Sequence, residues 1–167
     1  MKYSNILFKT FLVSSLFFLS IGCVSTKNTM EHFEKIIFHS TTCYGSCPSL
    51  SLEVHADRST KLQRQFYAFG GKEIAANSGT FQGSMNKQSF KLLMKTLKNS
   101  QYEKLAFPNI DCCDAPVITI IIYANGKRTY LKSMMPLQEA TELIQFLTEL
   151  TKDINLPTTT EKFEIEQ

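Results

Sequence analysis

The chain has 167 residues, of which 43% are hydrophobic and 20% are charged, a composition typical of one folded domain. It excludes a disordered chain, a collagen-like fibre and a protein with many membrane spans. The formal net charge is +3. Because Lys2 and Lys9 belong to a predicted export signal, the exported chain carries about +1. A strongly basic surface is therefore excluded, and we expect no nucleic-acid partner.

Residues 1–22 have the layout of a bacterial secretory signal. Residues 1–9 carry two lysines and no acidic residue, and residues 10–21 are almost wholly apolar or hydroxylated. The apolar stretch is shorter than the roughly 20 residues of a membrane-spanning helix, and polar residues follow it at once. We therefore expect the segment to be cleaved.

The end of this signal resembles a lipobox, the motif in which a cysteine is acylated before the signal peptidase cuts. Its residues are Leu19-Ser20-Ile21-Gly22-Cys23, with Ser20 where leucine is commonest. The resemblance implies that Cys23 becomes a lipidated N-terminus, and several acyl chains give a lasting membrane anchor. Val24 does not favour inner-membrane retention, so we expect the outer membrane, facing the periplasm. The alternative is an ordinary secretory signal with Cys23 near the cut.

The remaining chain divides into three parts by composition. Residues 23–33 are rich in serine, threonine and asparagine and predict a lipidated tether. We expect the part between the two ends, residues 34–153, to form a single domain. Residues 154–167 contain Leu156-Pro157, three threonines and three glutamates, so we predict a flexible acidic tail.

Four strands are predicted in the first half of the domain. Residues 35–40 form a short apolar run, and residues 50–56 alternate between apolar and polar side chains. A turn leads to a third strand over residues 61–69. The fourth covers residues 79–83, where two glycines indicate a bulge or close backbone packing.

Two amphipathic helices are predicted, one in each half. Asn86 is a candidate N-cap of the first, and Pro136 fits the first turn of the second. The apolar stripe of the first helix is Phe90, Leu93, Met94 and Leu97. The stripe of the second is Ala140, Leu143, Ile144, Leu147 and Leu150.

A hairpin is predicted between the two helices. Residues 117–123 are mostly β-branched and apolar, as in a central strand buried on both faces. Asn125-Gly126 favours a tight turn, so residues 127–133 should pair antiparallel with this strand. The order β-β-β-β-α-β-β-α predicts an α+β fold, an antiparallel sheet of five to six strands with two helices on one face.

Four cysteines fall into two loops and are the strongest candidates for chemistry. Cys43 and Cys47 follow the first strand, whereas Cys112 and Cys113 precede the central strand. In an exported protein such cysteines are read first as disulfides, and four of them allow three pairings. Loop entropy favours cross-links between the two loops, local proximity favours Cys43–Cys47, and a bond between adjacent cysteines is the least comfortable geometrically. The sequence leaves the pairing open.

Cys43 and Cys47 have two interpretations besides a structural disulfide. One is a thiol–disulfide redox centre, although no helix follows to lower a thiol pKa. The other is a copper or zinc site, because His39 lies four residues before Cys43. Considered by itself, His39 is more simply explained as an ordinary strand residue. We therefore expect neither a metal site nor a cofactor, and keep the metal site as the alternative.

The residues Cys43-Tyr44-Gly45-Ser46-Cys47-Pro48 and Asp114-Ala115-Pro116, with the glycine-flanked strand at 79–83, resemble a bacterial family catalogued as domain of unknown function 6438. The resemblance spans residues 34–153 and makes Tyr44, Gly45, Pro48, Asp114 and Pro116 motif residues. It implies a Cys43–Cys47 bridge and a lipoprotein setting, and it supplies no reaction.

No catalytic motif accompanies these features. The chain lacks a Gly-x-Ser-x-Gly elbow, a Walker loop, a His-Glu-x-x-His motif and a dinucleotide fingerprint. The sequence therefore indicates a lipid-anchored protein of the bacterial cell envelope with a binding or accessory structural role and an envelope protein as partner. A thiol-based redox or metal-handling protein is the alternative.

Overall fold

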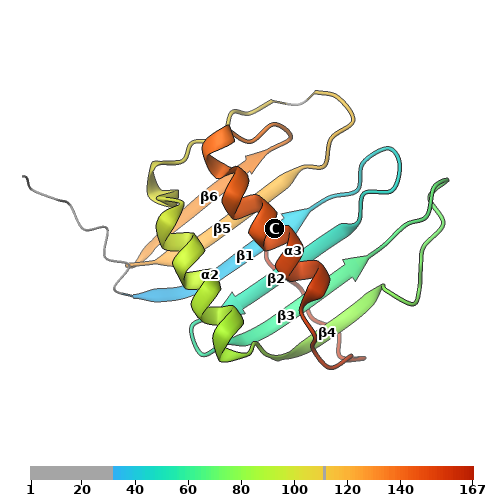
Figure 1. Ribbon diagram of the computed structural model, residues 1–167, viewed down its shortest axis with the longest axis horizontal. Coiled ribbons are helices and arrows are strands. Elements are labelled where there is room, and N and C mark those ends of the chain that lie inside the picture. The colour runs from blue at the N-terminus through green and yellow to red at the C-terminus, as the bar shows by residue number, and fades with distance from the viewer. Residues whose placement is uncertain (1–31, 111) are drawn as a thin grey trace, which may run out of the picture.

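The computed structural model describes residues 32–110 and 112–167, so the predicted signal, Cys23 and most of the tether lie outside the described residues. Within the described part, a six-stranded antiparallel sheet has the order β4-β3-β2-β1-β5-β6 and carries two helices on one face (Figure 1). The predicted α+β class is confirmed. No helix in residues 32–110 or 112–167 is long and apolar enough to span a bilayer.

The elements follow the predicted order, with two short 3-10 helices added. The strands are β1 (Phe33–Ser40), β2 (Ser49–His55), β3 (Ser59–Gln65), β4 (Gly79–Ser84), β5 (Ile118–Ala124) and β6 (Lys127–Ser133). The helices are α2 (Lys87–Asn99), η2 (Tyr102–Lys104), η3 (Gln138–Ala140) and α3 (Thr141–Asp153).

Strands β1 and β5 form the centre of the sheet and are buried on both faces. They pair antiparallel, with Ile36 opposite Ile122 and Ile37 opposite Ile121. Ile36 and Ile122 point toward the helices, whereas Ile37 and Ile121 belong to a separate cluster on the other face. The apolar run at 117–123 therefore reflects burial on both sides, as predicted.

Helices α2 and α3 cover one face of the sheet (Figure 1). Asn86 caps α2 as expected, because its Oδ1 accepts a hydrogen bond from the Ser89 amide at 2.8 Å. Leu93, Leu97, Leu143 and Leu147 are fully buried between the helices and the sheet. The prediction that Pro136 lies in the first turn of the second helix was wrong. The short helix η3 precedes α3, so the proline lies outside the first α-helical turn.

The turns explain two element boundaries. Asn125 and Gly126 both have positive φ, 54° and 70°, which is the geometry expected for the two-residue hairpin between β5 and β6. Strand β3 ends at Gln65, not at residue 69, because the chain turns back and the Ala68 amide donates to the Lys72 carbonyl at 2.8 Å.

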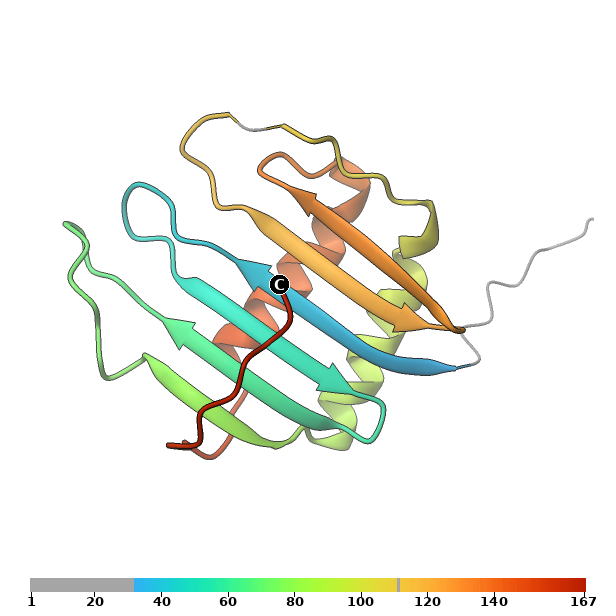
Figure 2. The same ribbon diagram turned by 180° about the vertical axis from the view of Figure 1, so that it is seen from behind.

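The C-terminal segment corrects the prediction of a flexible tail. Residues 157–159 pair with the exposed edge of β4, and the chain then crosses the outer face of the sheet, opposite the helices (Figure 2). Ile165 packs against Ile37 and Ile121 and is 5% exposed. Phe163 and Ile165 face the sheet, whereas Glu164 between them faces solvent. The acidic composition of the segment gave no indication of this alternation.

Gly83 allows this segment to approach β4. A Cβ at this position would lie 3.1 Å from Cδ of Pro157 and 3.4 Å from a methyl carbon of Leu156. The close backbone packing predicted for the glycines of β4 is therefore found at Gly83.

Charged side chains fasten the end of the segment to the outer face. Glu166 forms ion pairs with Lys35 at 3.2 Å and with Arg128 at 3.0 Å, and it accepts a hydrogen bond from Tyr123 Oη at 2.8 Å. Burial alone would raise the pKa of Glu166, but these hydrogen bonds outweigh it and lower the pKa below its ordinary value.

Replacing Ile165 tests whether the segment is part of the fold. We expect Ile165→Ala to lower the free energy of unfolding by about 2 kcal/mol or more, because it leaves a cavity over Ile37 and Ile121. Urea titration measures the change, and Glu164→Ala at the exposed neighbouring position is the control. Equal stability of the two variants would contradict this placement of the segment.

Candidate functional site

The two cysteine loops lie at the same end of the sheet. Ser40 at the end of β1 is opposite Ile118 at the start of β5, so the loop after β1 and the segment before β5 must meet. Strand β6 returns to this end because it pairs antiparallel with β5. We call the end formed by residues 41–48, 112–117 and 134–137 the loop end.

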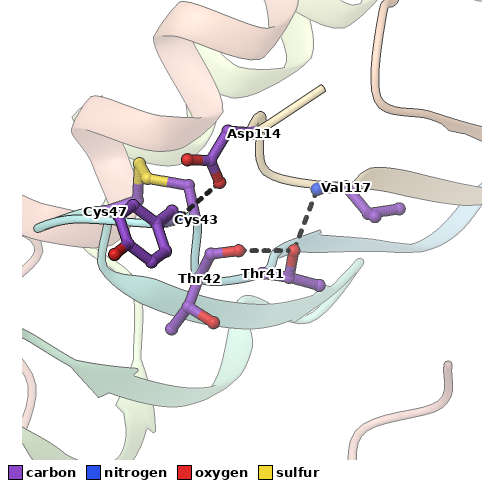
Figure 3. Close-up of a disulfide and its surroundings, with 7 residues drawn as sticks. Thr41, Thr42, Cys43, Cys47, Asp114 and Val117 are labelled. Atoms are coloured by element: carbon purple, nitrogen blue, oxygen red, sulfur yellow. Dashed lines mark hydrogen bonds between the residues drawn. A yellow bond between two sulfur atoms is a disulfide. The ribbon is translucent and has the colours of Figure 1, made fainter. Parts of the chain in front are cut away.

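A disulfide pins the loop between β1 and β2. Cys43 and Cys47 are bonded to each other, and their Cα atoms are 5.3 Å apart, a normal separation for a disulfide (Figure 3). Gly45 inside this ring has a φ of 139°, which side-chain-bearing residues rarely adopt. The five-residue ring therefore holds Tyr44 and Ser46 on a constrained turn.

Hydrogen bonds join this loop to the segment before β5 (Figure 3). The Tyr44 amide donates to Oδ1 of Asp114 at 2.7 Å. Thr41 makes two further links to Val117, from its amide to the Val117 carbonyl at 3.1 Å and from the Val117 amide to its hydroxyl at 2.9 Å. Asp114, predicted as a motif residue, therefore positions the disulfide loop.

An apolar cavity of about 440 Å³ opens beside the disulfide. We call it the loop-end cavity. Its lining includes Cys47, Pro48, Pro116, Met134, Leu137 and Ile144. Residues of both cysteine loops, the segment after β6 and helix α3 thus share one cavity.

Large apolar side chains at the loop end are unusually exposed. Tyr44 is 92% exposed at the tip of the disulfide loop, and Met135 and Leu137 are 49% and 41% exposed. Leu137 also lines the loop-end cavity, so exposed apolar side chains and an apolar cavity occur together at this end of the sheet. Exposed apolar surface concentrated in one place marks a binding site more often than scattered single residues do.

The second cysteine pair lies beside this surface. Cys112 and Cys113 are at disulfide distance from each other, so the structure pairs each loop within itself and not across the two loops. Cys113 has a positive φ of 57°, which places the pair in a turn. The cross-linked pairing that loop entropy favoured is not the one formed.

His39 does not join the cysteines, which corrects the alternative of a His39, Cys43 and Cys47 metal site. Side chains alternate along β1, so His39 faces the outer side of the sheet beneath the C-terminal segment. Its Nε2 donates to the Glu166 carbonyl at 2.6 Å, and its Nδ1 lies 2.8 Å from the Ser51 hydroxyl. Residues 32–110 and 112–167 contain no group of three or more His, Cys, Asp or Glu arranged to hold a metal ion.

Sequence reasoning missed Met134, Met135 and Leu137 as site residues. A signal was present, because Asn125-Gly126 predicts a hairpin in which the residues before β5 and after β6 lie side by side. The methionines after Ser133 must therefore lie near Cys112 and Cys113.

An antiparallel sheet with two helices on one face and a disulfide-pinned loop defines a small α+β domain with an apolar loop end. Residues 34–153 match the family described as Domain of unknown function (DUF6438), and the chain belongs to this family. The match confirms the predicted resemblance over the same residues, and the C-terminal segment that crosses the sheet lies outside it. The chain matches no curated protein and no solved structure.

The disulfide of the loop can be tested by thiol labelling. We expect Cys43 and Cys47 in the exported protein to resist alkylation until a reductant is added, because they are bonded to each other. The double variant Cys43→Ser/Cys47→Ser should lose about 2 kcal/mol of stability, the loop-entropy value for so short a ring. Intact mass and urea titration give the two readouts, with Cys112→Ser/Cys113→Ser as the matched control. Free labelling of Cys43 before reduction would contradict the bond.

Asp114→Ala should loosen the disulfide loop. The Tyr44 amide loses its acceptor, so we expect its hydrogen exchange to accelerate by about tenfold, equivalent to about 1.4 kcal/mol. Asp57→Ala is the matched control, since Asp57 accepts a similar bond from the Ser59 amide at the other end of the sheet. Unchanged exchange at Tyr44 would show that Asp114 does not hold the loop.

His39 should make stability depend on pH. Burial lowers the pKa of His39 below 6.5, against the opposing effects of the Glu166 carbonyl and of the Glu166 and Glu53 charges. The unfolded chain therefore binds the proton more readily, and stability should fall as the pH drops below about 6.5. We expect His39→Gln to flatten the change in unfolding free energy between pH 7.5 and pH 5, whereas His32→Gln at an exposed position should not. A parallel pH profile for both variants would contradict the effect.

Proposed function

We propose that this protein is a lipid-anchored binding module of the bacterial cell envelope, which contacts another envelope protein through its loop end. The signal-like residues 1–22 and the lipobox-like segment ending at Cys23 support the anchor. In this proposal the acylated Cys23 holds the domain at the outer membrane, and the domain faces the periplasm.

The polarity of β1 favours this arrangement. Strand β1 begins at Phe33, directly after the predicted tether, and Phe33 is opposite Ala124 beside the Asn125-Gly126 turn. The disulfide loop begins at the other end of the same strand, about 25 Å away for eight residues. An anchored domain would thus hold its tether end toward the membrane and its loop end toward a partner.

The observation that carries the binding role is the exposed Tyr44 on a doubly constrained loop beside the loop-end cavity. A tyrosine side chain buries a large area on binding, and the Cys43–Cys47 bond and the Asp114 hydrogen bond reduce the entropy lost when the loop is immobilised. The cavity would accept an apolar side chain of the partner next to the tyrosine ring.

The alternative role, thiol–disulfide exchange by Cys43 and Cys47, has weaker support. Reactive cysteines usually lie at a helix N-terminus or beside a cation, where the thiolate is stabilised. The element after Cys47 is strand β2, so neither cysteine begins a helix whose first amides would stabilise a thiolate.

Site-specific photo-crosslinking in intact cells tests the binding role. A photoreactive residue in place of Tyr44 should give a discrete adduct with an envelope protein, and Leu137→Asp at the cavity rim should abolish it. Lys127, exposed at the tether end, is the matched control position and should give no adduct. Equal adducts at both positions, or none at position 44, would refute the proposed surface.

The anchor is tested separately. Cys23→Ser should move the protein from the membrane fraction to the soluble periplasmic fraction, because the acyl chains are lost. Intact mass of the wild-type protein should show the lipid on a chain that begins at Cys23. A membrane-bound Cys23→Ser variant would contradict the anchor without bearing on the loop end.

A further inference from the structure

Four sulfur-containing side chains gather at the loop end apart from the Cys43–Cys47 disulfide. Cys112 and Cys113 come from the segment before β5, and Met134 and Met135 follow β6. The Sγ atoms of Cys112 and Cys113 are in contact, and Sγ of Cys112 lies 3.2 Å from Sδ of Met135. Met134 turns the other way and lines the loop-end cavity.

From this geometry we propose that Cys112, Cys113 and Met135 form a binding site for Cu(I) when the two cysteines are thiols. Thiolate and thioether sulfurs are soft donors that select Cu(I), whereas a zinc site would draw its ligands from cysteine, histidine and carboxylates. The proposal is independent of the binding role of the loop end, and it uses neither His39 nor the Cys43–Cys47 pair.

The distances suit a shared ion. Metal–sulfur bonds are about 2.3 Å long, so two sulfurs on one ion are about 3.3 to 4.0 Å apart for bond angles of 90° to 120°. The separation of 3.2 Å between Cys112 Sγ and Met135 Sδ is therefore close to that of two ligands on one metal. Sγ of Cys113 is in contact with Sγ of Cys112, so the third sulfur lies within reach of the same ion.

The surrounding hydrogen bonds position the donors from both sides. Asp114, directly after Cys113, is held by the Tyr44 amide at 2.7 Å. Just after β6, the Met135 amide donates to the Ser133 hydroxyl at 3.0 Å, and that hydroxyl donates to the Pro108 carbonyl at 2.7 Å. Asp114 is thus bonded to the disulfide loop, and at the end of β6 residues 133–135 are bonded to one another and to Pro108. Such support preorganises a ligand set.

The binding step balances without electron transfer. Cu(I) keeps its oxidation state, two Cu–thiolate bonds and one Cu–thioether bond form, and the two thiols release two protons to solvent. A disulfide between Cys112 and Cys113 leaves only the thioether, so the oxidised pair does not bind the ion. A reduced dithiol oxidoreductase of the envelope would open that disulfide by supplying two electrons and two protons.

Titration of the full chain with Cu(I) tests the site. The background variant is Cys23→Ser/Cys43→Ser/Cys47→Ser, which retains only the thiols of Cys112 and Cys113. After reduction with a phosphine and in the presence of a competing Cu(I) chelator, it should bind one equivalent, with three sulfur ligands by X-ray absorption. Alkylation or reoxidation of the pair should abolish binding.

Methionine variants test whether Met135 is a ligand or whether the two thiols bind Cu(I) without it. Met135→Leu should weaken Cu(I) binding by about tenfold or more and reduce the number of sulfur ligands to two. Even residues that only orient a metal ligand typically contribute at least tenfold to metal affinity. Met134→Leu is the matched control and should bind as the background does. Equal affinities and equal sulfur counts for the two methionine variants would overturn the proposal.

A second comparison covers the case in which the background variant does not fold. Chains that keep Cys43 and Cys47 are reduced and titrated with and without Cys112→Ser/Cys113→Ser, and circular dichroism monitors their structure. The proposal requires the chain with Cys112 and Cys113 to bind one more Cu(I) than the variant. Equal stoichiometry would overturn it.

Discussion

The burial of β1 and β5 on both faces is the constraint on which the rest of the structure depends. Their isoleucines point alternately toward the helices and toward the outer face, so both sides of the sheet require a cover. Helices α2 and α3 cover one side, and the C-terminal segment covers the other. The outer cover is narrow because the apolar cluster on this face is small, consisting of Ile37, Ile121 and their neighbours, whereas the flanking strands carry polar side chains there.

The same central pair determines where the candidate site forms. Because β1 and β5 are antiparallel neighbours, the segment after one adjoins the segment before the other, and two cysteine loops about 65 residues apart in sequence become hydrogen-bonded neighbours. The β5–β6 turn then returns the chain to the same end and adds Met134, Met135 and Leu137. The loop end is thus a direct consequence of strand pairing.

The two cysteine pairs have different surroundings and therefore different chemistry. Cys43 and Cys47 are separated by three residues and close a short ring whose turn is made possible by Gly45. Cys112 and Cys113 are adjacent, and a methionine sulfur contacts the first of them. A constrained turn suits the first pair to a structural role in recognition, whereas the neighbouring thioether suits the second pair to soft-metal chemistry.

Local signals in the sequence were sufficient for much of the fold. Alternation and β-branching located the strands, Asn86 marked the start of α2, and Asn125-Gly126 defined the hairpin, because each depends on residues within a few positions of one another. Contacts between segments that are distant in sequence could not be predicted from such signals. Because residues 154–167 are acidic, their two apolar side chains that pack on the sheet were not predicted. The spacing of His39 and Cys43 did not reveal that His39 is bonded to Ser51 and Glu166 on the outer face. By itself, the sequence determined the order and type of the elements and the family. Only the tertiary structure decided the cysteine pairing, the outer cover and the composition of the loop end, because each depends on which distant segments the sheet brings together.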